Sequence, residues 1–260
     1  MDTDSNTRQF YKNLFSQDPL WSQPYPNKDE AARWLKISGI LTQLISDSGN
    51  ELNRQLRILD NGCGRGWLTN LASLYGHAEG VDPIPESIHA ARSLYPHLSF
   101  FIGTVKEVNA AWNKEPYDII ISTEVLEHVI DKEGFIEDMI SCLRDNGYII
   151  VTTPRAELYD KWADLGYEKQ PVEQWLTEKE VSTLFKSYDL IPTFHDRIYV
   201  DMAGMSFLHR VSASRKVTDL LSRIKLAWIK QRLRYIAAIY QIWCFQYRKN
   251  SLPFRLMAEK

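Results

Sequence analysis

The sequence is poor in cysteine, and its three cysteines form no recognisable pairing or metal-binding pattern. Cys63, Cys142 and Cys244 lie far apart along the 260 residues. Neither a disulfide framework nor a zinc-finger spacing is therefore expected. This use of cysteine fits a reducing compartment. We expect a cytoplasmic protein without a bound metal.

Long apolar runs and a strong net charge are also missing. The longest apolar candidate, residues 235–245, is interrupted by Gln241 and is too short to span a bilayer. Residues 1–6 are polar and acidic, so no signal peptide is expected. The net charge of −2 argues against general nucleic-acid binding. At 44% hydrophobic residues the chain can bury one sizeable core, so we expect a single domain over residues 1–260.

The charge is nevertheless distributed unevenly. Residues 207–250 contain ten Lys or Arg and one acid, Asp219, which gives +9, so the rest of the chain carries −11. No Gly or Pro occurs over residues 211–250, and apolar residues recur there near helical spacing, which predicts one or two long helices. We expect these helices to pack on their own domain or in a homodimer. Peripheral contact with an anionic membrane, or a basic collar for an acidic substrate, are the alternatives.

What the sequence does contain is a strand, a glycine turn and a helix in immediate succession. The apolar residues 56, 58 and 59 predict a buried strand, and three glycines follow at 62, 64 and 66. The apolar residues 68, 71, 72 and 74 then recur at helical spacing. Glycine lets a ligand approach the backbone, and a helix N-terminus favours a negatively charged group. A second short strand ends at Asp82, where a nucleotide-binding α/β unit places a carboxylate for the ribose hydroxyls.

The whole pattern resembles the class I S-adenosylmethionine (SAM)-dependent methyltransferases, in particular small-molecule O-methyltransferases of the quinone, glycan and natural-product type. The resemblance covers residues 56–154 and departs from the usual pattern at Asn61. It implies an α/β fold with a Rossmann-like seven-stranded sheet, mostly parallel with an antiparallel last strand, and helices on both faces. The matching residues are Leu59-Asp60-x-Gly62-Cys63-Gly64-x-Gly66, Gly80-Val81-Asp82-Pro83, Tyr117-Asp118-Ile119-Ile120, Glu124-Val125-Leu126-Glu127-His128-Val129 and Gly147-Tyr148-Ile149-Ile150-Val151.

The resemblance also implies which residues hold SAM, or its product S-adenosylhomocysteine (SAH). Asp82 would bind the ribose, and the glycine turn would bind the methionine end. Arg33, on a helix expected to begin after Asn27, would reach the methionine carboxylate, and Thr104 stands where the family often has an acid for the adenine. The complete expected set is Arg33, Asp60, Gly62, Cys63, Gly64, Gly66, Asp82, Pro83, Ile84, Thr104, Val105, Thr123 and Glu124.

The remaining organisation combines the residue pattern with the same resemblance, which implies the insertion and the final strand. We expect an N-terminal lid or helix over residues 1–46, a core over 56–200, a basic helical insertion over 201–250 and a final strand over 251–260. The aromatic N-terminal segment either covers apolar surface or closes over the cofactor. The long connection at 155–175 is expected to cover the substrate.

The expected chemistry is transfer of the SAM methyl group to a hydroxyl or carboxyl oxygen of a small-molecule biosynthetic intermediate. His128 is the candidate base, assisted by Glu127, because histidine titrates near neutral pH. The alternative is a histidine that only makes local hydrogen bonds. Together with Glu124 these residues offer too few ligands to predict a metal. His195 with Asp196 is a second candidate base, or a solvated loop pair.

Two other functions are compatible with the sequence. One is methylation of a peptide, or of a membrane-associated lipid or quinone, with the basic segment recruiting the enzyme to the membrane. The other is a SAM-binding protein without turnover, since the glycine turn and Asp82 indicate binding but not transfer.

Overall fold

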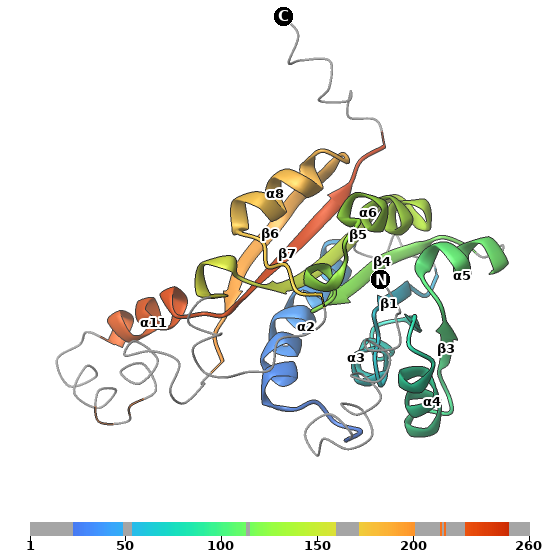
Figure 1. Cartoon of the computed structure of the whole chain (residues 1–260), viewed down its shortest axis with the longest axis horizontal. Coiled ribbons are helices and arrows are strands. Elements are labelled where there is room, and N and C mark those ends of the chain that lie inside the picture. The colour runs from blue at the N-terminus through green and yellow to red at the C-terminus, as the bar shows by residue number, and fades with distance from the viewer. Residues whose placement is uncertain are drawn as a thin grey trace, which may run out of the picture.

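The computed structural model describes residues 23–48, 54–112, 115–159, 172–200, 214, 216 and 227–249. They build a seven-stranded sheet in the order β3-β2-β1-β4-β5-β7-β6 (Figure 1). The strands are β1 (Arg57–Asn61), β2 (His77–Asp82), β3 (Ser99–Ile102), β4 (Tyr117–Thr123), β5 (Leu143–Pro154), β6 (Leu190–Ile198) and β7 (Tyr240–Tyr247). Strands β1 to β5 pair in parallel, whereas β7 is antiparallel to both of its neighbours. The expected fold class is confirmed.

Helices cover both faces of this sheet (Figure 1). They are α2 (Lys28–Ser48), α3 (Trp67–Ala72), α4 (Pro85–Leu94), α5 (Val105–Trp112), α6 (Lys132–Ser141), α8 (Glu178–Lys186) and α11 (Ala227–Ile236), with short 3-10 turns at Leu126–His128 and Ala156–Leu158. Central strand β4 shows how the two faces are filled. Ile119 and Ile121 belong to the core cluster with α2 and α3, whereas Ile120 belongs to the cluster with α5, α6 and α8. Alternate residues of a strand point to opposite faces, so an unbroken apolar strand is what two helical layers require.

The start of α2 is fixed by a reciprocal cap, as its sequence predicts. Asn27 Oδ1 accepts hydrogen bonds from the amides of Asp29 and Glu30, both at 3.0 Å. Glu30 Oε2 in turn accepts the amide of Asn27 at 2.7 Å. These bonds satisfy three amides at a helix end that lack intrahelical partners. The same device, between Thr177 and Glu180, starts α8.

The antiparallel strand lies earlier in the chain than we expected, which corrects the predicted organisation of the C-terminal part. Strand β7 occupies residues 240–247, inside the predicted helical insertion 201–250, while the predicted final strand at 251–260 lies outside the described residues. Cys244 and Phe245 pack into the core clusters on opposite faces of the sheet. Because apolar side chains of this segment lie on both faces of the sheet, it is a buried strand and not the buried helix that we inferred.

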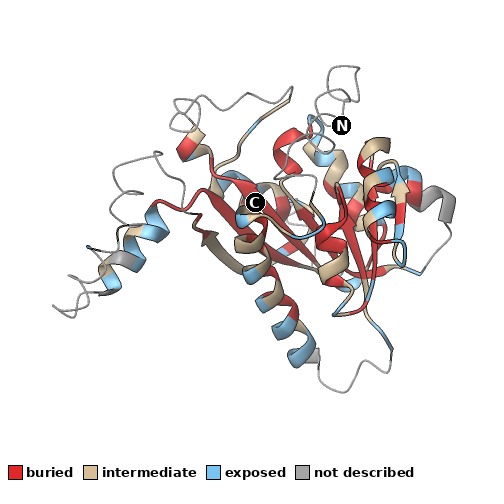
Figure 2. Cartoon of the chain, turned by 90° about the horizontal axis from the view of Figure 1, so that it is seen from below, coloured by how far each residue is buried: buried red, intermediate tan, exposed pale blue. Residues whose placement is uncertain are grey.

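Helix α11 is the described part of the predicted basic insertion. It lies at one end of the molecule, away from the sheet, and carries mostly exposed residues (Figures 1 and 2). Among the described residues, no helix is both long enough and apolar enough to cross a bilayer. Residues 1–22 of the predicted N-terminal lid, and residues 160–171 of the predicted substrate-covering connection, lie outside the described ranges.

Candidate functional site

The turn after β1 requires glycine for both conformation and space. Gly62, Gly64 and Gly66 have φ angles of 82°, 52° and 82°, in the left-handed region that side chains disfavour. A Cβ atom on Gly62 would lie 2.2 Å from Cγ2 of Val125, the second residue after β4. The amides of residues 62 and 63 both donate to the carbonyl of Val81, at 2.9 and 3.0 Å. The turn therefore lies between the ends of β2 and β4 and contacts both.

Asp82, the last residue of β2, holds this turn from the other side. Its Oδ2 accepts the Gly64 amide and its Oδ1 accepts the Ile84 amide, both at 2.9 Å. Each carboxylate oxygen can accept a second hydrogen bond, so with respect to the described residues two acceptor positions stay available for a ligand. Burial raises the pKa of Asp82 to about 6, although the two amides oppose this change. This geometry suits the expected contact with ribose hydroxyls, which stays a prediction.

Asp60 is the penultimate residue of β1 and is 1% exposed. Its Oδ2 accepts the Thr69 hydroxyl at 2.7 Å, whereas its Oδ1 has no hydrogen-bond partner among the described residues. Burial raises the pKa of Asp60 to about 7, and the neighbouring Asp82 raises it further. A buried acceptor without a partner is costly, and a bound ligand with a hydroxyl or ammonium group would satisfy it. The expected cofactor carries both kinds of donor, so the turn fits it.

Two acids and a histidine follow β4 at the same edge of the sheet. Glu124 has a φ of 56° and accepts the Thr152 hydroxyl at 2.8 Å, while Glu127 accepts the Thr153 hydroxyl at 3.0 Å. Burial raises the pKa of Glu124 to about 8 and that of Glu127 to about 7. In the part of the chain that the structure describes, no group of three or more His, Cys, Asp or Glu side chains is arranged to hold a metal.

The backbone selects one tautomer of His128. Its Nδ1 lies 2.6 Å from the carbonyl oxygen of Val172, and because a carbonyl only accepts, Nδ1 must carry the proton. In the neutral ring Nε2 then has the free lone pair, and it lies 3.7 Å from Oε1 of Glu127. Burial lowers the pKa of His128. The ring is therefore neutral near pH 7, as a general base requires, and its catalytic role stays a prediction.

Arg33 brings a buried positive charge to these acids from α2. It is 3% exposed, and its guanidinium carbon lies 5.1 Å from the ring centroid of Tyr240, the first residue of β7. Burial opposes the charge, but Glu124 and other nearby acidic groups outweigh this effect and raise the pKa of Arg33. Its Nε has no hydrogen-bond partner among the described residues. Its expected contact with the methionine carboxylate stays a prediction.

The other expected cofactor residues are engaged in the fold. The amide and hydroxyl of Thr104 both donate to Glu107, at 2.8 and 3.1 Å, so Thr104 starts α5. Val105 packs in the core cluster of α5, α6 and α8. The Cys63 thiol is buried, which raises its pKa. Pro83 and Ile84 follow β2, and Thr123 ends β4. The contacts of these residues with the cofactor stay predictions.

His195 does not belong to a solvated loop, which corrects that alternative. It lies within β6 and stacks on Trp243, with 3.8 Å between the ring centroids. Its Nε2 lies 3.5 Å from Glu178, whereas the adjacent Asp196 pairs with Lys36. The expected His195 and Asp196 pair is therefore divided between two different partners.

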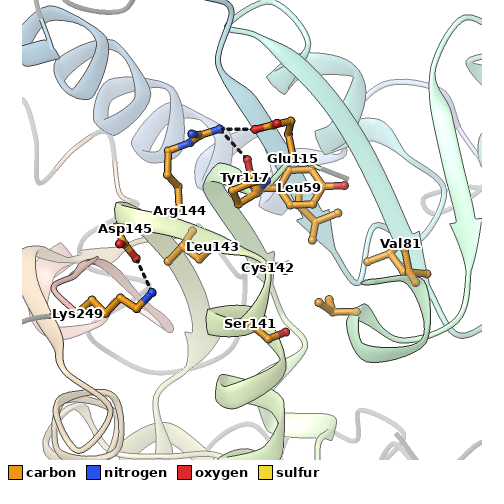
Figure 3. A pocket seen from close by; sticks show the side chains of 13 residues that line it. Leu59, Val81, Glu115, Tyr117, Ser141, Cys142, Leu143, Arg144, Asp145 and Lys249 are labelled. Carbon is orange, nitrogen blue, oxygen red and sulfur yellow. Dashed lines mark hydrogen bonds and ion pairs between the residues drawn. The ribbon is translucent and has the colours of Figure 1, made fainter. Parts of the chain in front are cut away.

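A pocket of about 580 Å³ lies at the opposite edge of the sheet (Figure 3). Its walls include Tyr117 at the start of β4 and Leu143 at the start of β5. Arg144 pairs with Glu115 at 3.5 Å, and Lys249 pairs with Asp145 at 3.6 Å. Because parallel sheets of this type bind ligands at the carboxyl ends of their strands, this pocket is not the candidate site.

Two residues of the site are not among those that the sequence pattern predicts. Tyr240 was assigned to a helix, although it faces Arg33 from the sheet. Arg65 was treated as a variable position between Gly64 and Gly66, although it is 1% exposed and paired with Glu30. A long charged side chain inside a glycine turn, directly after a buried strand, was the available signal.

The raised carboxyl pKa values predict a protein that loses stability as pH rises. Asp82, Asp60, Glu127 and Glu124 have pKa values of about 6, 7, 7 and 8 in the fold. In the unfolded chain they ionise near pH 4, so the stabilisation is complete below that pH and is lost as pH passes through the folded values. A tenfold change in one ionisation constant corresponds to about 1.4 kcal/mol. We expect the melting temperature of the ligand-free protein to fall from pH 5.5 to 8.5 in scanning calorimetry.

Two variants test whether the raised carboxyl pKa values cause this fall of the melting temperature with pH. Glu124→Gln removes one ionisation and should make the fall smaller. Glu107→Gln is the control, because hydrogen bonds from Thr104 lower the pKa of Glu107 and its ionisation is complete below this range. A melting temperature that rises between pH 5.5 and 8.5, or an equal effect of both variants, would contradict the raised values.

Comparison with known proteins agrees with this geometry. A family model described as a methyltransferase domain matches residues 32–193. The ubiquinone biosynthesis O-methyltransferase of Bradyrhizobium diazoefficiens is 35% identical over 103 residues, 38% of this chain and 40% of that protein. The human mitochondrial ubiquinone biosynthesis O-methyltransferase is 32% identical over 106 residues, 38% of this chain and 28% of that protein. The matches thus span less than half the length of these curated relatives.

Solved structures extend the likeness to nearly the whole chain. The N-methyltransferase NodS of Bradyrhizobium japonicum has a TM-score of 0.58 at 16% identity, covering 93% of this chain and 98% of that one. The magnesium protoporphyrin IX methyltransferase of Synechocystis has a TM-score of 0.57 at 12% identity, covering 93% and 99%. At these identities the likeness shows the fold alone. Since the family model matches more than half of the 260 residues and the sheet has the expected order, the chain belongs to the methyltransferase-domain family, and its expected place among class I SAM-dependent methyltransferases is confirmed.

Proposed function

We propose that this protein transfers the methyl group of SAM to a hydroxyl oxygen of a small-molecule biosynthetic intermediate, a phenolic precursor of the quinone type. The observation that carries the proposal is His128, a buried neutral histidine with its lone pair on Nε2 at the ligand-binding edge of the sheet. The relatives named as ubiquinone biosynthesis O-methyltransferases support the oxygen and the acceptor class.

The first task of the chain is to bind and orient a cationic cofactor. SAM, when bound, supplies a methyl group that is already reactive because it is attached to a positively charged sulfur. Asp82 would accept the ribose hydroxyls, and Oδ1 of Asp60, which has no partner in the described part of the chain, would accept a further donor. Above about pH 7, where Asp60, Asp82 and Glu127 are ionised, these buried carboxylates outnumber Arg33, which favours a positively charged ligand in a medium of low dielectric constant.

The second task is to remove a proton from the acceptor. A phenol has a pKa near 10, so its oxygen is mostly protonated at neutral pH and benefits from a base. Nε2 of His128 would take this proton, while the Nδ1 hydrogen bond to Val172 keeps the ring in place. Glu127, 3.7 Å away, would stabilise the resulting imidazolium when it is ionised.

The proposal is tested by incubating the purified protein with SAM and an alkylated catechol, and measuring SAH and products by mass spectrometry. We expect SAH and a methoxyphenol in equal amounts. The corresponding dimethoxybenzene, which has no free hydroxyl, should give neither. Methylation of sarcosine or another amine in place of the catechol, or SAH binding without any turnover of phenols, would remove the proposal.

One observation favours a second candidate, in which the acceptor is presented by a membrane. On α11, Trp228 is 58% exposed and Ile236 is 47% exposed, next to exposed Arg232 and Arg234. Residues 227–236 contain no acid. An amphipathic helix with aromatic and basic residues is suited to the surface of an anionic bilayer.

We therefore predict that the protein sediments with vesicles containing phosphatidylglycerol and less with neutral phosphatidylcholine vesicles. Trp228→Ser combined with Ile236→Ser should weaken this partitioning about tenfold or more, since both apolar side chains leave the interface. Leu74→Ser is the matched control, because Leu74 is 78% exposed outside α11. Equal sedimentation with both lipids, or unchanged partitioning of the double variant, would exclude binding of α11 to a membrane surface.

A further inference from the structure

Arg65 is a charged residue in the middle of the glycine turn, yet it is almost completely buried. Its side chain is 1% exposed, as is that of its partner Glu30 in the first turn of α2. Nη1 lies 2.7 Å from one carboxylate oxygen of Glu30, and Nη2 lies 2.6 Å from the other. This bidentate geometry fixes the relative position of both groups. A shift of either partner would leave a charge without compensation inside the protein, which is strongly unfavourable.

The same guanidinium also holds the chain that leads into α2. Arg65 Nε donates to the carbonyl of Gln23 at 2.6 Å, and Nη2 donates to the carbonyl of Tyr25 at 3.2 Å. Between them, the carbonyl of Pro24 accepts the hydroxyl of Tyr95, which directly follows α4. The approach to α2 is thus attached to the cofactor half of the sheet at several consecutive carbonyls.

Glu30 connects this attachment to the rest of α2. Its Oε2 accepts the amide of Asn27 at 2.7 Å and so belongs to the helix cap as well as to the ion pair. Arg33 lies about one helical turn further on, where a side chain shares the face of Glu30. It is packed against Tyr240 and close to Glu124. One rigid turn of α2 therefore connects Glu30, which faces the glycine turn, to Arg33, which faces the acids after β4.

We propose that Arg65 and Glu30 are a positioning pair that couples occupation of the glycine turn to the placement of α2 and Arg33. A cofactor that fixes the turn in one conformation fixes Arg65, and through Glu30 it fixes the start of α2. The coupling is reciprocal, so any contact that fixes Arg33 and the start of α2 would in turn strengthen binding at the glycine turn. This inference rests on the proposed function, because it concerns the same site.

Hydrogen exchange with mass spectrometry measures the coupling. In the wild-type protein, saturating SAH should slow exchange both in the glycine turn (residues 62–66) and in the first turns of α2 (residues 27–36). Glu30→Gln keeps an amide oxygen for the Asn27 cap but removes the charge that faces Arg65. We expect this variant to keep the SAH effect at 62–66 and to lose at least four fifths of the effect at 27–36.

A second variant and a control separate coupling from simple stabilisation. Arg65→Lys keeps the charge but cannot form the bidentate pair, and it should also lose the effect at 27–36. Glu79→Gln alters another buried carboxylate, 1% exposed and paired with Arg57 on the same sheet. Its melting temperature should fall, whereas the SAH effect on 27–36 should be kept. If Arg65 only stabilised the fold, Arg65→Lys would behave like this control: its melting temperature would fall and the SAH effect on 27–36 would be kept.

Calorimetry on the same samples distinguishes the possible failures. If SAH binds the wild-type protein but leaves exchange at 27–36 unchanged, the coupling is wrong and the proposed function stands. The coupling is equally wrong if Glu30→Gln and Arg65→Lys both bind SAH and keep the full effect. If the folded wild-type protein gives no heat with SAH or SAM, the proposed function falls, and the coupling falls with it.

Discussion

Replacing Asp82 with alanine is expected to weaken SAH binding by roughly 100-fold to 10,000-fold. Hydrogen bonds from ligand hydroxyls to a carboxylate contribute about 1.5–3 kcal/mol each, and Asp82 has two free acceptor positions for them. The substitution also removes the acceptor of the Gly64 and Ile84 amides, so the turn loses part of its support. Titration calorimetry with SAH measures the change directly.

A second carboxylate on the same strand is the matched control for this prediction. Glu79 lies on β2, is 1% exposed and faces Arg57 and Tyr117 away from the glycine turn. Glu79→Gln should lower the melting temperature and leave the SAH affinity within about threefold of wild type. Asp82→Asn, which keeps one oxygen, should fall between wild type and Asp82→Ala. A folded Asp82→Ala protein that binds SAH as tightly as wild type would exclude this residue from ribose binding.

Replacing His128 with alanine should lower kcat by about 100-fold to 10,000-fold, the usual contribution of a general base, and leave SAH affinity nearly unchanged. The two effects separate because Nδ1 of His128 bonds to Val172 and its free Nε2 faces Glu127, whereas the glycine turn and Asp82 lie elsewhere along the sheet edge. Steady-state kinetics and calorimetry on the same protein test both parts. A control, His89→Ala, alters an exposed histidine of α4 and should change neither.

The pH dependence of kcat gives a second test of the role of His128, with a defined direction. Burial lowers the pKa of His128 below its ordinary value of 6.5, so the base form persists into mildly acidic solution. The acid limb of the kcat profile should therefore lie below pH 6.5 in the wild-type protein and be absent from His128→Ala. Added imidazole should restore part of the lost rate if the missing group is a base. Unchanged turnover in His128→Ala would leave His128 with a local structural role.

The parts of the fold that local patterns encode were predictable from the sequence. The helix expected after Asn27 is confirmed as α2, and Thr177 followed by Glu180 is the same local capping pattern at the start of α8. Helix α5 was overlooked because Thr104 was interpreted as an adenine contact, although Glu107 three residues later marks a helix start. Strand β7 was misassigned because a short segment that is apolar on all sides has no period that separates a strand from a helix.

The candidate site divides in the same way. Asp60, Asp82 and His128 could be brought to one edge from sequence alone, because the carboxyl ends of adjacent parallel strands meet there. The contacts of Arg65 with Glu30, and of Arg33 with Tyr240, join residues that are distant in the chain. No spacing rule predicts such contacts, since they depend on how α2 lies against the completed sheet.

The position of β7 between β5 and β6 has a consequence for the order in which this chain can become native during synthesis. Among the described residues, strand β6 pairs with β7 and no other strand, so residues 190–198 leave the ribosome before the β7 segment that will bind them exists. The parallel strands β1 to β5 can assemble earlier, because each of them pairs with another of these five strands and all five precede β6 in the chain. The edge of β5 that later pairs with β7 therefore stays unpaired until residue 247 has been synthesised. During this interval the unpaired edge must be shielded, because such edges promote aggregation.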